Sequence, residues 1–176
     1  MKTSNFYVRW LQVYSLLLSV CLVSSNSWAD ETLASLASPN QLLRVAVQRA
    51  GDGRLSYTVM RRGKILIAPS RLGFLLTNAP QLDAGFQLEK QSVSEHDDTW
   101  EQAWGERRFV RNHYKELRLD VVQKPPFDRH LTIVFRVFDD GVGFRYEFPD
   151  QAQLHEVKIS DELTEFVVAP DRKSVV

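Results

Sequence analysis

The stretch FRVFDDGVGFRYEFPDQ, residues 135–151, decides the fold class of this 176-residue chain. Apolar side chains alternate with other residues on both sides of the turn signal Asp140-Gly141. Successive side chains of a β-strand point to opposite faces, so this alternation predicts two strands that each bury one face. We therefore expect a β-hairpin in which glycine supplies the positive φ of the turn. The inward-facing residues would be Leu131, Ile133, Phe135 and Val137, then Val142, Phe144, Tyr146 and Phe148.

The same period of two recurs along much of the chain. Residues 43–47 and 55–59 alternate on either side of Gly51-Asp52-Gly53, and residues 117–121 alternate again before Pro125-Pro126. No segment carries a 3.6-residue apolar stripe of helical length. Many short strands separated by turn signals predict an all-β fold, an antiparallel β-sandwich of two sheets.

The first 29 residues have the features of a secretory signal peptide. Lys2 and Arg9 make the start positive, and an apolar segment follows from Val13 to Val23, which is short for a bilayer span. The small residues of Ser27-Trp28-Ala29 suit a cleavage site after Ala29. We expect the remaining 147 residues to be exported, periplasmic or extracellular, and not attached to a membrane after cleavage.

Removal of this segment also sets the composition of the mature chain. It takes away Cys21, the single cysteine, so the mature fold must be stable without disulfides. It leaves 20 basic residues against 22 acidic ones, a net charge of −2 with histidine neutral. Binding to a phosphate backbone needs a basic surface, so we expect no nucleic-acid partner.

A second informative stretch is TWEQAWGERRFVRNHYKEL, residues 99–117, which places Trp100 and Trp104 among charged and amide residues. Tryptophan is normally buried or used for binding. An indole offers a flat surface for the C–H face of a sugar ring, whereas the alternative is packing between the two sheets. We predict core packing for Trp100, and the two interpretations stay open for Trp104.

Several ordered motifs of these stretches resemble the N-terminal domain of glycoside hydrolase family 97. They are Trp104-Gly105-Glu106, Arg111-Asn112-His113-Tyr114, Glu116-Leu117 and Asp139 to Pro149. The resemblance implies a large two-sheet super-sandwich of the galactose-mutarotase-like kind. It also implies an N-terminal β-sandwich domain at 38–168, preceded by a linker at 30–37 and followed by an aberrant or truncated tail at 169–176.

The complete enzyme, by this resemblance, is a calcium-dependent α-glucosidase or α-galactosidase whose (β/α)8 barrel follows the N-terminal domain. The catalytic carboxylates, most of the calcium ligands and the contact with oligosaccharide would belong to that barrel, before which we expect this chain to be truncated. One further calcium ligand, expected from the N-terminal domain, would fall beyond Val176. We therefore expect no catalytic residue, no metal site and no cofactor in this chain, and no activity by the chain alone.

The residues themselves agree with that expectation. Asp97-Asp98 and Asp139-Asp140 are neighbours, and neighbours point to opposite faces of a strand or form turns, unlike a pair of glycosidase carboxylates. The four histidines lack the short paired spacing of a zinc site. They stand singly at His96, His113, His130 and His155.

We predict that this domain braces the barrel and forms one wall of its sugar pocket. Trp104, Glu106, Arg111, Asn112 and His113 are the candidate residues facing the substrate or the barrel. For the four polar residues, interface and strand-anchoring roles are favoured over direct sugar contact. The alternatives are a free-standing carbohydrate-binding module, which needs an accessible Trp104 in a groove, and a non-functional truncated gene product.

Overall fold

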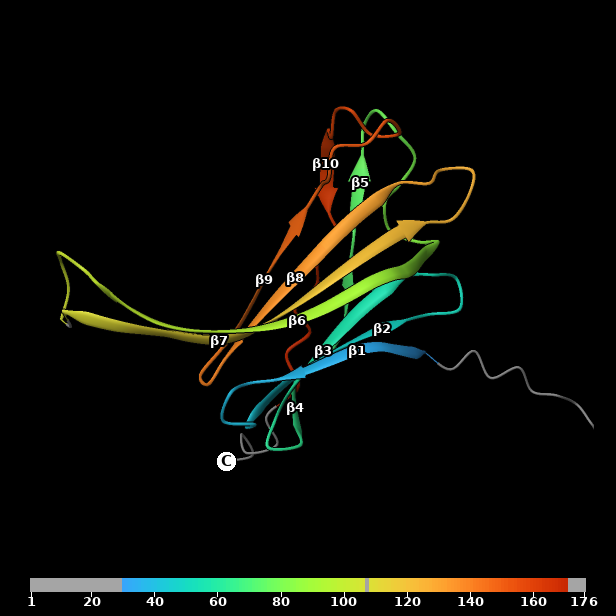
Figure 1. Cartoon of the computed structure of the whole chain (residues 1–176). Helices are drawn as coiled ribbons and strands as arrows, with labels where there is room; N and C mark the ends of the chain where they lie inside the picture. Colours follow the sequence, from blue (N-terminus) through green and yellow to red (C-terminus); the bar gives the residue numbers. More distant parts are fainter. Residues whose placement is uncertain (1–29, 107, 171–176) are drawn as a thin grey trace, which may run out of the picture.

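The computed structural model describes residues 30–106 and 108–170, and within these ranges the protein is built from ten β-strands (Figure 1). The strands are β1 Glu31–Ala37, β2 Leu43–Arg49, β3 Leu55–Arg61, β4 Lys64–Leu72, β5 Phe74–Leu76, β6 Phe86–Glu101, β7 Phe109–Gln123, β8 His130–Phe138, β9 Val142–Glu147 and β10 Ile159–Glu162. No helix in the described ranges is long and apolar enough to cross a membrane. The predicted signal peptide lies outside the described residues.

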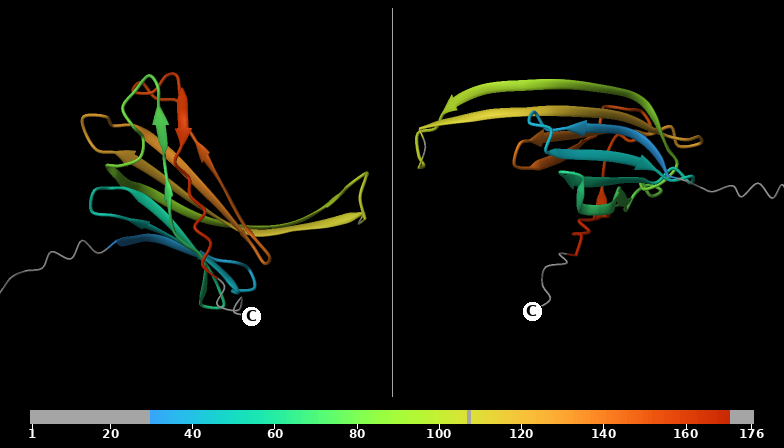
Figure 2. Two further views of the ribbon diagram at one scale, coloured as in Figure 1. Left: turned by 180° about the vertical axis from the view of Figure 1, so that it is seen from behind. Right: turned by 90° about the horizontal axis from the view of Figure 1, so that it is seen from below.

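Two four-stranded antiparallel sheets pack face to face and confirm the predicted sandwich. One sheet has the order β1-β2-β3-β4 and the other β6-β7-β8-β9, while β10 and β5 form a small third sheet beside them (Figures 1 and 2). The inner faces interdigitate in one core. Burying a large apolar side chain there contributes about 1.5–3 kcal/mol relative to leaving it exposed. Fully buried examples are Val45 and Tyr57 on one sheet and Leu119, Ile133 and Phe135 on the other.

The predicted hairpins are present, with one difference in turn geometry. Gly53 has a φ of 81° in the β2–β3 turn, and Gly63 has a φ of 76° in the β3–β4 turn, as glycine permits. In the β8–β9 hairpin the Phe138 N–H donates to the Gly141 carbonyl at 2.8 Å. The turn is therefore centred on Asp139-Asp140, and Gly141 does not take a left-handed φ. The predicted hairpin is right, but its turn lies one residue earlier than expected.

The expected linker at 30–37 is wrong, because Glu31–Ala37 form strand β1 at the edge of the first sheet. Leu36 pairs with Val45 of β2 and is buried, as is Ala34 two residues earlier. This short alternation of small apolar residues with polar ones is enough for an edge strand, which packs only one face. At the other end, Ala169 belongs to the fold, since its N–H donates to the Leu66 carbonyl at 2.9 Å.

Strands β6 and β7 are far longer than their neighbours, with 16 and 15 residues. Strand β8 pairs with β7 only as far as the Tyr114–Phe138 pair, where the β8–β9 turn begins. Beyond that pair, β6 and β7 continue as a two-stranded ribbon that extends past the end of the sandwich (Figures 1 and 2). We call residues 97–113, which contain the ends of both strands and their connection, the arm.

Candidate functional site

The arm carries all five candidate residues, and strand alternation divides them between its two faces. On β7, Leu117 and Leu119 point into the core, so the odd-numbered Arg111 and His113 lie on the continuation of that face. Asn112 lies on the opposite face, opposite Asp98 of β6. The three side chains therefore do not form one polar cluster.

On the core-side face, ion pairs hold the two strands together. Arg111 donates twice to Asp97, with Nε–Oδ1 of 2.7 Å and Nη2–Oδ2 of 2.6 Å, in bidentate geometry. These hydrogen bonds hold the pKa of the Asp97 carboxyl below its ordinary value. His113 lies 3.0 Å from Glu95 through its Nε2 atom. Arg111 and His113 thus anchor one strand of the ribbon to the other.

On the opposite face, an amide contact and an indole lie side by side along the ribbon. Asn112 donates from Nδ2 to Asp98 Oδ1 at 3.0 Å. Trp100, two residues further along β6 on the same face, is 48% exposed. The prediction that Trp100 packs in the core is wrong, because among residues 30–106 and 108–170 no further strand pairs with this part of the ribbon and Trp100 stays half exposed.

The connection at the end of the arm holds Trp104 out in solvent. Gly105 has a φ of 126°, and a Cβ at this position would lie 2.7 Å from Gln102 Nε2. The motif Trp104-Gly105-Glu106 thus contains a backbone conformation that L side chains rarely adopt. Trp104 is 89% exposed and Glu106 is exposed as well. Trp104 is therefore accessible, but it lies in neither the core nor a groove.

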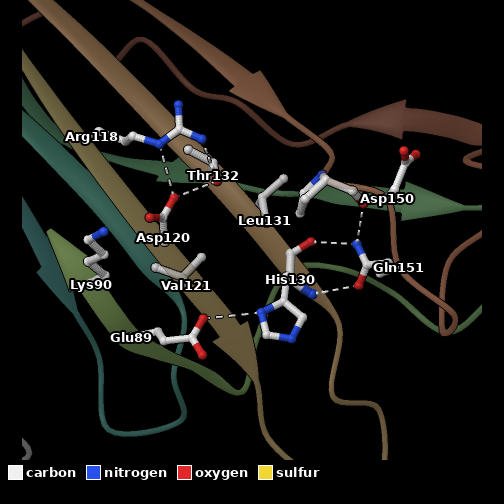
Figure 3. A pocket seen from close by; sticks show the side chains of 11 residues that line it. Glu89, Lys90, Arg118, Asp120, Val121, His130, Leu131, Thr132, Asp150 and Gln151 are labelled. Atoms are coloured by element: carbon white, nitrogen blue, oxygen red, sulfur yellow. Dashed lines mark hydrogen bonds and ion pairs between the residues drawn. The ribbon is translucent and has the colours of Figure 1, made fainter. Parts of the chain in front are cut away.

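A second candidate region, missed in the sequence, is a groove of about 590 Å³ on the outer face of β6, β7 and β8 (Figure 3). Its polar lining is internally paired: Asp120 accepts from Thr132 at 2.7 Å and lies 3.3 Å from Arg118, and His130 lies 3.2 Å from Glu89. The residues come from three strands and the loop after β9, so no contiguous motif reveals them. The sequence signal available for this groove was the alternation along β7, which places charged residues on its outer face.

The acidic neighbours behave as the sequence predicts. Asp139 lies in the β8–β9 turn, and its Oδ1 accepts the N–H of Asn40 in the β1–β2 turn at 2.8 Å, which joins the two turns. Asp97 and Asp98 point to opposite faces of β6 and have separate partners. Within the described ranges no three histidine, cysteine or acidic side chains gather as metal ligands would. The arm and the groove therefore offer hydrogen bonds and aromatic surface rather than a pair of reacting carboxylates.

Comparisons with known proteins identify what this sandwich is similar to. The family model described as Glycosyl-hydrolase 97 N-terminal matches residues 36–176, which include the expected tail at 169–176. A glycoside hydrolase family 97 enzyme from Pseudoalteromonas sp. strain K8, solved in complex with acarbose and in another structure with panose, is 32% identical with a TM-score of 0.73. A β-arabinopyranosidase is 26% identical with a TM-score of 0.71. In these matches 77% of this chain is covered, but it spans only about a fifth of the relatives' length, 20% and 21%.

Proposed function

Because this chain belongs to glycoside hydrolase family 97 as its N-terminal domain, we propose that it braces a catalytic barrel and forms one wall of the barrel's sugar pocket. The whole protein would be an exported, α-glucosidase-like enzyme of carbohydrate metabolism, with calcium held by the barrel. Export rests on the signal-peptide features of residues 1–29. The α-glucosidic preference is supported by the relative that was solved with panose, an oligosaccharide of glucose.

The observation that carries the proposal is that this chain matches only a small part of a longer enzyme. It matches about a fifth of a family 97 enzyme that has been solved with oligosaccharides. On the arm, Asp97 and Asp98 are engaged in an ion pair and a hydrogen bond, and in the groove Asp120 accepts from Thr132. The domain is thus suited to structural support, and the hydrolytic chemistry belongs to the rest of the enzyme.

The test is complementation in trans. The chain would be mixed with the Pseudoalteromonas enzyme expressed without its matching fifth, and hydrolysis of panose and thermal unfolding would be followed. We expect no hydrolysis by the chain alone, and a higher unfolding temperature or higher activity of the catalytic part when the chain is added. A catalytic part that is indifferent to the chain at all concentrations would refute the bracing role.

A free-standing carbohydrate-binding module is the second candidate, favoured by the exposure of Trp104. An exposed indole at the end of a ribbon is a surface on which a sugar ring could stack. Calorimetric titration of the chain with panose separates the two functions. Binding that disappears in Trp104→Ala would support the module, and absence of binding by the unaltered chain would dismiss it.

A further inference from the structure

The arm is energetically unfavourable in a domain that binds no partner, because its two strands are not packed on a core. Its strands pair only with each other from Asp97–His113 to Glu101–Phe109. A two-stranded hairpin is marginally stable in water, since neither face packs on a core. Here the strands are joined by exposed ion pairs, which contribute little to stability because solvent screens them. A partner that covers the ribbon would supply the burial that the domain itself does not.

Large aromatic side chains gather on the distal part of this ribbon. Phe109, the first residue of β7, is 59% exposed on the face that carries Arg111. Trp100 is 48% exposed on the opposite face, and Trp104 is 89% exposed in the connection between the strands. Tryptophan and other aromatic residues are the side chains that most often dominate binding energy at protein interfaces. These three side chains within ten residues expose apolar surface on both faces and at the tip of the ribbon, which an isolated monomer has little reason to keep.

The end of the sandwich beside the arm is apolar as well. Phe166 and Val168 are 65% and 71% exposed there, next to a cleft of about 250 Å³ lined by Tyr57, Val59 and Phe144 among others. The two views of Figure 2 show the arm running past this end, so that ribbon and sandwich end meet at an angle. The hydrogen bonds to Asp97 are the main cause that raises the pKa of Arg111 above its ordinary value, and the charge of Asp139 in the β8–β9 turn adds a smaller contribution in the same direction.

The course of the chain indicates which partner occupies this angle. Residues 163–169 run antiparallel to β4, with the Ala68 N–H donating to the Val167 carbonyl at 2.8 Å. The described part of this segment reaches the exposed sandwich end, where the Ala169 N–H donates to the carbonyl of Leu66, a residue that lines the same cleft. In the solved relatives the part outside the match is about four-fifths of the chain.

We propose that the arm docks onto this remaining, catalytic part of a family 97 enzyme, with Trp104 and Phe109 as its main contacts. The inference rests on the function proposed above and adds the surface through which the domain acts. The paired charges of Arg111 and Asp97 keep the ribbon in register, and the aromatic side chains make the contact. The arm thus holds the catalytic part against the sandwich end.

The experiment measures affinity by titration calorimetry. The chain, its double variant Trp104→Ala with Phe109→Ala, and a control variant would each be titrated into the Pseudoalteromonas enzyme lacking its matching fifth. The control is Ile159→Ala on β10, an exposed apolar residue of the small third sheet, away from the arm (Figure 1). All three substituted side chains are exposed, so circular dichroism and the unfolding temperature should match those of the unaltered chain.

We expect the double variant to bind at least tenfold more weakly and the control to bind within twofold of the unaltered chain. Equal affinity of the double variant would overturn the docking surface and leave the bracing function standing. No binding by the unaltered chain would overturn both. If light scattering instead shows a dimer of the chain that the double variant abolishes while binding to the enzyme is unchanged, the arm's partner is a second copy and the proposal is wrong.

Discussion

Replacing Arg129 with methionine tests the polar contact that joins the β7–β8 turn to the loop after β5. Arg129 is 2% exposed, and its guanidinium donates to Gln123 Oε1 at 2.9 Å, to the Pro80 carbonyl at 2.8 Å and to the Gln81 carbonyl at 2.9 Å. Burial lowers the pKa of Arg129, yet the side chain stays charged because its ordinary pKa is so high. The substitution keeps an apolar side chain in place and removes the donors.

The expected loss follows from the acceptors that remain. The Gln81 carbonyl still accepts from Gln123 Nε2 at 3.2 Å, and Pro80 is exposed, so the loss falls mainly on the buried Gln123 Oε1. A buried acceptor without a donor costs about 1–3 kcal/mol. Removing the desolvated charge of Arg129 offsets part of this, which leaves a net loss of about 1–2 kcal/mol. For a domain of this size the unfolding temperature should fall by about 2–8 °C.

Urea unfolding followed by far-ultraviolet circular dichroism measures this free energy of unfolding, because Trp100 and Trp104 are exposed on the arm and do not report on the core. The matched control is Arg108→Met on the arm, whose exposed side chain makes an ion pair of 2.7 Å with Glu101. Exposed pairs contribute about 0–1 kcal/mol, so the control should be nearly neutral. A loss below about 1 kcal/mol for Arg129→Met, or one no larger than that of the control, would refute the reasoning.

Three other perturbations address the core and the arm. Phe135→Ala removes a fully buried ring and should lower the free energy of unfolding by about 3–5 kcal/mol in urea; a loss under 1 kcal/mol would contradict the core assignment. Gly105→Ala forces a strained φ at the end of the arm and should speed amide exchange there without changing the unfolding midpoint, and unchanged exchange would argue against the strain. Pairing with Arg111 lowers the pKa of Asp97, so its contribution is complete above pH ~4 and is lost as the pH falls through the lowered value. Exchange protection of the arm should therefore decrease below pH ~4, and Asp97→Asn should remove this pH dependence.

The sequence predicted the architecture well because its signals are local. In the β8–β9 hairpin, alternation marks Phe135 and Phe144 as inward-facing, and the acidic turn between the strands is equally visible. The family motifs lie on the strands that the alternation predicts. The edge strand β1 was missed because Ala34 and Leu36 alone form its buried face, too little apolar surface for a period to stand out.

The arm shows why the candidate residues were harder to place. The segment around Arg111 and His113 belongs to β7. No local sequence signal marks where β8, which pairs with β7 on the side away from β6, comes to its end. That point is set by the length of β8, which turns back after Phe138 and leaves the arm without a third strand. The exposure of Trp100 and the division of the polar residues between two faces both follow from it.

The sequence by itself determined the all-β sandwich, the principal hairpins and the family, because strand period, turn residues and motif order can be read from the order of the residues alone. The tertiary structure alone decided that β6 and β7 extend beyond the end of β8 and expose Trp104 and Phe109 to solvent. It also decided that residues from three strands line the outer groove. The physical reason is that exposure depends on what the other strands cover. This coverage is a property of register and strand length between segments far apart in the chain.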